Sequence, residues 1–233
     1  MRSMSAITLS ALLAACGGAT SEGDHAAHHP GAHGHDGAGH DHDFSDVERF
    51  AAIFDDPARD EWQRPEHVVE LLQLEEGAVV ADIGAGTGYF VPHLSQAVGA
   101  SGHVIALDVE PAMVEHMQQR FQEAGIENAE ARVVQPDDPG LEPGSVDRIL
   151  IVDTWHHIQD RPGYAGRLRS ALRPGGFVLV VDFTEDSPHG PPEAMRLNAH
   201  EVHGELSRGG LTCDHVDEEL PYQFIVRAAR PTE

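Results

Sequence analysis

Two hydrophobic periods alternate along the chain from residue 44 onward. Short apolar runs have the length of buried strands, and between them apolar residues recur every three or four positions, as on one face of a helix. The strand-like runs cover 79–83, 104–109, 131–134, 146–153 and 177–183. Because strands that alternate with helices need crossover connections, the pattern predicts an α/β fold with a mostly parallel sheet and helices on both faces.

The two ends of this region complete the predicted topology. Apolar stripes at helical spacing predict further helices over 44–54, 65–72 and 192–207. Ser45 or Asp46 can cap the first of them through its side-chain oxygen. After the last helix come two extended runs, 211–219 and 222–230. Because only a short connection separates them, we expect these runs to pair as an antiparallel hairpin.

Residues 1–16 have the pattern of a signal peptide. One arginine precedes an apolar stretch that is shorter than the roughly 20 residues needed to span a bilayer. Its end, Leu13-Ala14-Ala15-Cys16, resembles the bacterial lipobox, in which the cysteine is lipidated. We therefore expect a lipoprotein-type signal peptide over 1–16 and a membrane anchor at Cys16. The alternative is an unstructured start with a chance cysteine.

Residues 17–43 are rich in Gly, Ala, Asp and His and hold no apolar residue larger than Ala apart from one proline. Such a segment cannot build a core, so we expect a disordered tether between the anchor and a domain over 44–233. Its histidines are His25, His28, His29, His33, His35, His40 and His42. Imidazole suits Zn²⁺, Ni²⁺ and Cu²⁺, so these histidines are candidate metal ligands. A solvated spacer is the alternative.

The stretch 79–90 carries the most specific motif. An apolar strand runs into Asp82-Ile83-Gly84-Ala85-Gly86-Thr87-Gly88, and a helical pattern follows. Glycines permit a tight turn and a close approach to a ligand, and the start of a helix offers unpaired N–H groups. A dinucleotide fingerprint would need glycine where Tyr89 stands, and a phosphate-binding loop would need a Gly-Lys pair. The spacing therefore disfavours both of those ligands.

The amino-acid composition indicates which classes of binding partner the protein can have. The 233 residues, 40% of them hydrophobic, suffice for one core and predict one domain. Asp and Glu number 39 against 15 Lys and Arg, which gives a formal charge of -24. A surface this acidic repels phosphate backbones, so we expect no nucleic-acid partner.

The loop Asp-x-Gly-x-Gly-x-Gly resembles motif I of the class I S-adenosyl-L-methionine (SAM) methyltransferases. Three more segments match that family in the right order: Leu107-Asp108, 147–157 and 172–177. The chain thus looks like a small-molecule SAM-dependent methyltransferase. The resemblance implies a Rossmann-like, seven-stranded, mostly parallel sheet with a C-terminal antiparallel hairpin, and SAM bound at the carboxyl ends of the first three strands.

The resemblance also implies roles for single residues. The cofactor-binding residues it implies are Asp82, Gly84, Ala85, Gly86, Gly88, Asp108, Val109, Asp137, Asp138 and Asp153. Asp82 and the glycines would hold the methionine end of SAM. Asp108 lies about 20 residues beyond the loop, where an acid accepts hydrogen bonds from ribose hydroxyls, and Val109 would pack on adenine. Either Asp137 or Asp138 would bind the adenine amino group; both are alternatively turn-forming acids.

The sequence says less about the methyl acceptor than about the cofactor. Enzymes that methylate amino groups of nucleic acids carry Asn/Asp-Pro-Pro-Tyr after the fourth strand, where this chain has Asp153-Thr154-Trp155-His156. We therefore expect a small-molecule acceptor; a quinone, a lipid or a phenol all stay open. Histidine is suited to remove a proton near pH 7, so His156 and His157 are candidate catalytic residues. Either could instead make a hydrogen bond at a helix start.

Two tryptophans near the expected site each leave two structural alternatives. Trp155 either forms a wall of the acceptor pocket or packs beneath the fourth strand. Trp62, in a polar connection before the first strand, is either a lid over the site or a plug in the core.

The sequence leaves alternatives open for both the function and the cellular location of the protein. One is a catalytically degenerate methyltransferase fold that acts as a membrane-tethered binding module with a metal-binding tail. Another is a nucleotide-dependent oxidoreductase, which Tyr89 disfavours. The anchor at Cys16 predicts a lipoprotein that faces the periplasm. Because SAM is made in the cytoplasm, a cytoplasmic location is the alternative.

Overall fold

The computed structural model describes residues 46–214, 216 and 220–232. The expected signal peptide, the tether and all seven of its histidines lie outside these residues and stay predictions. Within the described residues, no helix combines the length and the apolar character that crossing a bilayer requires.

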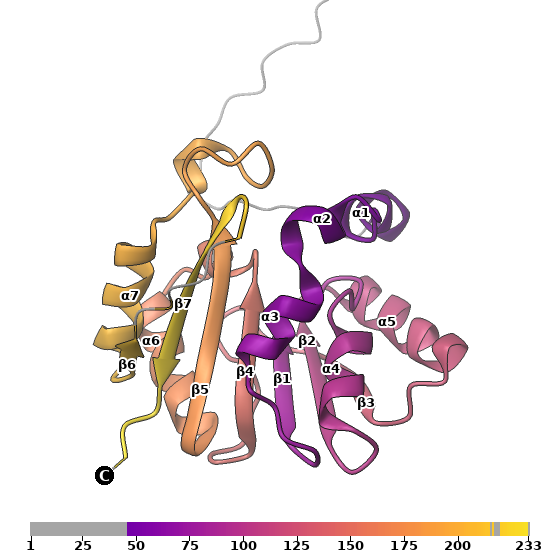
Figure 1. Cartoon of the computed structure of the whole chain (residues 1–233), viewed down its shortest axis with the longest axis horizontal. Helices are drawn as coiled ribbons and strands as arrows, with labels where there is room; N and C mark the ends of the chain where they lie inside the picture. The colour runs from indigo at the N-terminus through magenta and orange to yellow at the C-terminus, as the bar shows by residue number, and fades with distance from the viewer. Residues whose placement is uncertain (1–45, 215, 217–219, 233) are drawn as a thin grey trace, which may run out of the picture. The chain divides into compact units, whose positions relative to one another are not determined.

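One seven-stranded sheet forms the centre of the domain, in the order β3-β2-β1-β4-β5-β7-β6 (Figure 1). The strands are β1 Val79–Ile83, β2 His103–Asp108, β3 Ala129–Val133, β4 Val146–Val152, β5 Leu172–Phe183, β6 Thr212–Asp214 and β7 Gln223–Ala229. Strands β1 to β5 run parallel, whereas β7 pairs antiparallel with β5 and with β6. The Rossmann-like sheet and its antiparallel C-terminal hairpin are therefore confirmed.

Helices cover both faces of the sheet. They are α1 Val47–Phe54, α2 Arg59–Gln63, α3 Pro65–Leu71, α4 Val91–Val98, α5 Pro111–Ala124, α6 Arg161–Ala171 and α7 Ala199–Arg208, with 3-10 turns at Trp155–His157 and Glu193–Met195. Buried side chains of α3, α4 and α5 pack on one face, and those of α6 and α7 pack on the other. Helices α1 and α2 lie beyond the carboxyl ends of β1 and β2 (Figure 1). The predicted cap of the first helix is confirmed, because the Asp46 side chain accepts from the N–H of Arg49.

The helix predicted over 192–207 is wrong in its first half. Helix α7 begins only at Ala199, where Asn198 and Glu201 form a capping box. The preceding segment winds around Arg196, whose guanidinium donates to the backbone carbonyls of residues 185, 187, 189 and 191 at 2.7–3.1 Å. The side chain of Arg196 is therefore bound to the loop that precedes it, and regular α-helix starts only at Ala199.

Two other segments differ from the sequence prediction. The polar connection around Trp62 contains a short helix, α2, and Trp62 is only partly buried, outside the core. The extended run predicted over 211–219 forms a strand only at Thr212–Asp214, where it pairs with β7. The second run, predicted over 222–230, is confirmed as β7.

Candidate functional site

The glycine loop follows β1 at the edge of the sheet where the parallel strands end. Gly84 has a φ of 70° and Gly86 a φ of 58°, values that residues other than glycine rarely adopt. A Cβ atom on Gly84 would lie 2.3 Å from the side chain of Thr154, which follows β4. Glycine is thus required here because the loop and the end of β4 approach each other closely. The approach places residues after β1 and after β4 in one site.

Asp82, on β1 beneath this loop, carries an unsatisfied buried atom. Its side chain is 2% exposed, and its Oδ2 finds no hydrogen-bond partner among the residues that the structure describes. Burial, and secondarily the charge of Asp108, raises the pKa of Asp82 to about 7. A buried carboxylate oxygen without a donor is costly, and a cationic or hydrogen-bond-donating ligand would relieve that cost.

Asp108 lies at the end of β2, across the loop from Asp82. Its Oδ2 accepts from the N–H of Gly86 at 2.8 Å, and its Oδ1 accepts from the N–H of Glu110 at 2.9 Å. Burial raises its pKa, although the backbone donors oppose that shift. A carboxylate can accept about four hydrogen bonds, so both oxygens retain capacity for ligand hydroxyls.

An apolar ledge lies beside Asp108. Val109, directly after β2, is 50% exposed, and Val133, at the end of β3, is 49% exposed. The register pairs Asp108 with Val133, so all three residues meet at the ends of adjacent strands. Large apolar side chains with this exposure suit the face of a flat aromatic ligand. The family resemblance implied that Val109 packs on adenine. The sequence analysis did not name Val133 as a site residue.

The acids after β3 occupy an exposed turn. Asp138 accepts from the N–H of Gly140 at 2.9 Å and lies 3.6 Å from Arg167 of α6. Asp137 is exposed. Asp138 therefore stabilises the turn, which was the alternative to binding adenine. The carboxylate of Asp137 does not make this hydrogen bond to Gly140.

Asp153 follows β4 and belongs to a closed ring of side chains. Its φ is +53°, unusual for a residue other than glycine. Oδ1 accepts from Gln223 at 2.5 Å, and Oδ2 faces Arg59 at 3.4 Å. Gln63 completes the ring, because it donates to Gln223 at 2.7 Å and accepts from Arg59 at 2.9 Å. Burial raises the pKa of Asp153 to about 7.

Helices α1 and α2 are attached to the glycine loop by polar contacts. The hydroxyl of Thr87 donates to Asp55 at 2.9 Å, and Arg120 of α5 donates to the same carboxylate at 2.8 Å. The hydroxyl of Tyr89 donates to Asp60 of α2. These contacts hold α1 and α2 against the loop.

The two histidines after β4 have different surroundings. His156 Nδ1 lies 2.9 Å and 3.0 Å from the two carboxylate oxygens of Asp182 on β5, and the two side chains are 2% and 3% exposed. His157 is exposed. A carboxylate on Nδ1 selects the tautomer in which that nitrogen carries the proton, so Nε2 is the nitrogen that can accept one. The geometry thus distinguishes His156 as the oriented imidazole.

Trp155 is a core residue and not a pocket wall. It is 0% exposed, and its indole N–H donates to Glu205 of α7 at 2.9 Å. The alternative in which it packs beneath β4 is therefore correct. Trp62, by contrast, stacks on His189 with ring centroids 4.7 Å apart and lies 6.0 Å from the ring of Phe183. It joins α2 to the segment after β5, above the same edge of the sheet.

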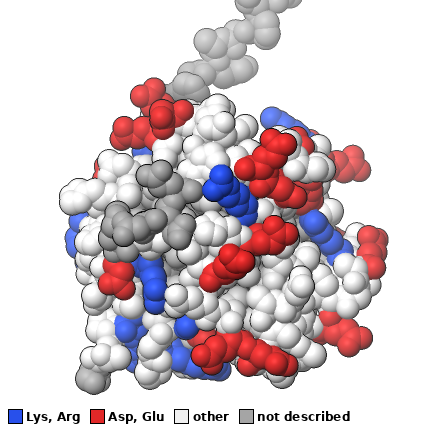
Figure 2. All heavy atoms as spheres, viewed as in Figure 1, with Lys and Arg blue, Asp and Glu red and all other residues white. Residues whose placement is uncertain are grey.

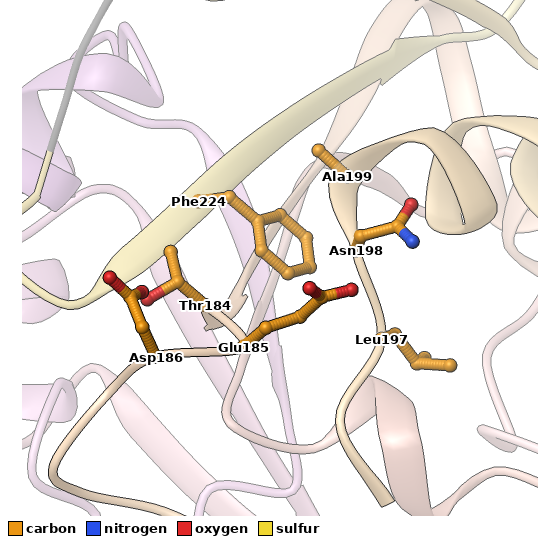
Figure 3. Close-up of a pocket in the computed structure, with 7 residues that line it drawn as sticks. All are labelled: Thr184, Glu185, Asp186, Leu197, Asn198, Ala199 and Phe224. Carbon is orange, nitrogen blue, oxygen red and sulfur yellow. The ribbon is translucent and has the colours of Figure 1, made fainter. Parts of the chain in front are cut away.

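A hollow of about 320 Å³ lies where β5 ends and α7 begins. Its lining residues are Thr184, Glu185, Asp186, Leu197, Asn198, Ala199 and Phe224 (Figure 3). The ring of Phe224 and the side chain of Glu185 extend toward the segment that starts α7. Phe224 pairs with Asp182 across β5 and β7, although Asp182 and His156 are not among the residues that line the hollow.

Figure 2 shows acidic side chains over much of the visible face, whereas Lys and Arg side chains gather mainly toward its lower left. In the described part of the chain, no group of three or more His, Cys, Asp and Glu side chains could hold a metal ion. The predicted metal ligands of the tether lie outside that part.

Several residues of this site were not found from the sequence. They are Arg59, Gln63, Val133, Asp182 and Gln223. Val133 and Asp182 had a detectable signal, since each stands at the carboxyl end of a predicted strand. Arg59, Gln63 and Gln223 had none, because the contacts that join α2, Asp153 and Gln223 span 70 to 160 residues.

Comparison with known proteins gives consistent matches. Residues 80–176 match the family described as "Methyltransferase domain". The chain is 29% identical over 126 residues to the ubiquinone/menaquinone biosynthesis C-methyltransferase UbiE of Idiomarina loihiensis and 24% identical over 170 residues to that of Hydrogenovibrio crunogenus. These alignments cover 53% and 72% of this chain, but only 49% and 64% of the relatives' own lengths.

A solved structure resembles the whole domain. The crystal structure of a SAM dependent methyltransferase from Aquifex aeolicus superposes with a TM-score of 0.75 at 29% identity, over 81% of this chain and 99% of that one. A methyltransferase from Haloferax volcanii, solved with the activator Trm112, superposes with a TM-score of 0.66 at 18% identity. The second likeness concerns the fold alone, whereas the first agrees with the sequence matches.

Proposed function

We propose that this chain, a SAM-dependent methyltransferase, transfers the methyl group of SAM to a small-molecule acceptor at the carboxyl edge of β1, β2 and β4. The observation that carries the proposal is the buried Oδ2 of Asp82 beside the glycine loop, for which the described part of the chain offers no hydrogen-bond partner. It marks a place where a ligand with a positive or donating group stabilises the protein.

The residues present fit SAM. Asp82 would receive the ammonium group, Asp108 the ribose hydroxyls, and the ledge of Val109 and Val133 one face of the adenine. Gly84 and Gly86 leave the backbone open to close approach. When bound, SAM supplies a methyl group on a positively charged sulfur. The protein's part is to align the acceptor with that methyl group and to exclude water.

We infer that His156 is the base of the reaction and Asp182 its positioning residue. A neutral O–H, N–H or activated C–H acceptor must lose a proton as the new bond to carbon forms. Nε2 of His156 would accept that proton, and the Asp182 carboxylate at 2.9 Å would stabilise the imidazolium that results. His157 is exposed, whereas the side chain of His156 is buried against Asp182.

The acceptor is proposed to enter through the hollow beside Phe224. Its volume of about 320 Å³ suits a small ring compound, and Phe224 and Leu197 give it an apolar wall. The relatives' name as C-methyltransferases of quinone biosynthesis makes a carbon atom on a phenolic or quinol ring the first acceptor to test. Such a ring is neutral, in keeping with an acidic protein that repels anionic acceptors.

Calorimetry with the full chain tests the cofactor. Binding of SAM with no binding of NAD supports the proposal over the oxidoreductase alternative. Binding of neither ligand would contradict it. The comparisons give no support to the catalytically degenerate alternative; SAM binding without turnover of any phenolic or quinol acceptor would revive it.

Matched histidine variants test the base. His156→Ala should keep its SAM affinity and lose turnover by about 100-fold or more, whereas His157→Ala should retain most of it. Asp182→Asn should shift the pH profile of turnover, which a merely structural role would not do. Normal turnover by both histidine variants would mean that alignment alone drives methyl transfer.

We further propose that lipidated Cys16 anchors the protein to a membrane and that the domain faces the periplasm. The lipobox-like Leu13–Cys16 and the glycine-rich residues directly after it support this. The seven histidines of residues 17–43 are proposed to bind Zn²⁺, Ni²⁺ or Cu²⁺.

A further inference from the structure

The segment 172–177 is one of the stretches that match the methyltransferase family, yet it lies far from the proposed SAM site. It begins β5, whereas the glycine loop follows the end of β1. Because β1, β4 and β5 run parallel, the starts of these strands lie at the opposite edge of the sheet (Figure 1). Gly176 is needed there for packing, since a Cβ atom would lie 2.8 Å from the carbonyl oxygen of Asp147. That packing does not account for the charged side chains around the segment.

A second hollow, of about 400 Å³, lies at this edge. Its lining comes from the turn before β1 (residues 73–78), the start of β4 (147–148) and the start of β5 (173–176). Its volume falls within the roughly 300–1,000 Å³ of small-molecule sites. We call it the amino-edge hollow, because it lies where the parallel strands begin.

Four arginines gather at the amino-edge hollow. They are Arg148, Arg173, Arg227 and Arg230. Arg148 and Arg173 line it, and Arg230 donates to the carbonyls of Leu172 and Gly176. The chain has 15 arginines, no lysine and a formal charge of -24, so this is a local concentration of positive charge on an acidic protein. Basic side chains gather toward the lower left of Figure 2, the region where β7 ends in Figure 1.

Two of these guanidinium groups lie against one buried ring. The guanidinium of Arg148 is 4.3 Å and that of Arg227 is 4.0 Å from the centre of the Phe177 ring, which is 1% exposed. Burial, and also the charge of Arg227, lower the pKa of Arg148, although Asp147 opposes the shift. Two like charges around one apolar ring are costly unless an anion lies near them.

The hydrogen bonds of these arginines leave donors for a ligand. Arg148 donates from Nε to the carbonyl of Leu72 and from Nη1 to the carbonyl of Asp147, both at 2.8 Å. A guanidinium has five N–H groups, so three remain. The Nε of Arg227 is buried and has no hydrogen-bond partner among the described residues. A buried donor without an acceptor is costly, and an anionic ligand would relieve that cost.

The acids of the hollow do not cancel this charge. The carboxylate of Asp147 accepts from the N–H of Val79 at 2.8 Å and from Arg173 at 2.6 Å, so it is already bound. Glu75 and Glu76 are exposed, where water screens their charges. Four arginines against three acids leave a positive site in a strongly negative chain.

We propose that the amino-edge hollow binds a molecule that carries a phosphate group, with Arg148 and Arg173 as its binding residues. A phosphate group has three acceptor oxygens and nearly two negative charges, so it suits several guanidinium groups at once. The phosphate belongs either to a soluble compound or to a lipid headgroup. Because the hollow and the glycine loop lie at opposite edges of the sheet, SAM should not compete for it.

Calorimetry on the full chain with pyrophosphate tests the site, at low salt to limit screening. Arg173→Met and Arg148→Met should each weaken pyrophosphate at least about tenfold. Arg148→Lys keeps the charge without the planar fork and should recover part of the loss. Glu75→Gln removes a negative charge beside Arg148 and should strengthen binding.

Two controls keep the result specific. Arg208→Met, at the exposed end of α7, makes the same change in net charge and should bind pyrophosphate within about twofold of the unaltered protein. Thermal unfolding without ligand shows whether each variant is folded. Arg173 has a side chain that is 41% exposed, so its variant serves if Arg148→Met does not fold.

Vesicles distinguish the two sources of phosphate. Cosedimentation compares vesicles of phosphatidylglycerol with vesicles of phosphatidylcholine, using the unaltered protein and Arg173→Met. A lipid headgroup as ligand predicts that Arg173→Met reduces binding to phosphatidylglycerol alone. Pyrophosphate binding that depends on Arg173, without any such change on vesicles, indicates a soluble phosphate compound. If neither probe shows binding that Arg148→Met or Arg173→Met weakens more than Arg208→Met does, the proposed site is wrong.

Discussion

The charge of Asp82 offers a test of the cofactor site that needs no mutation. Burial raises its pKa to about 7, so about half of the molecules are charged at pH 7.0 and about one in thirty at pH 5.5. If only the charged form binds the ammonium group, the apparent affinity for SAM falls about 15-fold between these pH values. The ligand stays charged over this range, because an α-amino group titrates near pH 8.

Calorimetry at both pH values on three proteins measures this effect. Asp82→Asn keeps the shape of the side chain and cannot ionise, so it should bind SAM weakly at pH 7.0 and lose the Asp82 part of the pH dependence. Asp214→Asn, exposed on β6, is the control and should behave as the unaltered protein. An affinity that differs less than about twofold between the two pH values would refute the reasoning, and so would an Asp82→Asn variant with the full dependence.

The same pKa shift has a consequence for stability. An unfolded aspartate titrates near 3.8, so the raised folded-state value favours the ligand-free fold below about pH 4 and this contribution is lost as the pH rises through about 7. Asp153, also raised to about 7, adds a contribution of the same sign. A positively charged ligand bound beside Asp82 stabilises the carboxylate and so offsets the cost of burying its charge at pH 7.0. SAM should therefore raise the melting temperature more at pH 7.0 than at pH 5.5, which thermal unfolding with and without SAM measures.

Three further predictions concern other parts of the chain. Asp108→Ala should lower SAM affinity at least about tenfold in calorimetry, since each charge-assisted hydrogen bond is worth about 1.5–3 kcal/mol; an unchanged affinity would remove Asp108 from the site. Deleting residues 19–43 should abolish Zn²⁺ or Ni²⁺ binding and leave SAM affinity unaltered, and a drop in that affinity would show that the segment contacts the domain. Cys16→Ser should release the protein from the membrane fraction; recovery of the unaltered protein in the cytoplasm with residues 1–15 attached would contradict the lipoprotein proposal.

Local pattern determined most of the fold and the framework of the site. Strand-length apolar runs that alternate with helical stripes determined the sheet and its parallel strands, because burial on both faces leaves that signature in the sequence. The carboxyl ends of those strands then placed Asp82, Asp108, Val109 and His156 at one edge. These inferences succeeded because each depends on residues within one strand–turn–helix unit.

Tertiary structure decided which side chains meet. Arg59 joins Asp153 across 94 residues and Gln63 joins Gln223 across 160, and no local pattern specifies such contacts. His156 is buried against Asp182, which a different strand brings within 2.9 Å, whereas His157 is exposed. The segment around Arg196 forms only a 3-10 turn and no α-helix, and the guanidinium binds carbonyls of the preceding loop. In each case the deciding interaction is a hydrogen bond, which depends on distance in space and not on a local sequence pattern.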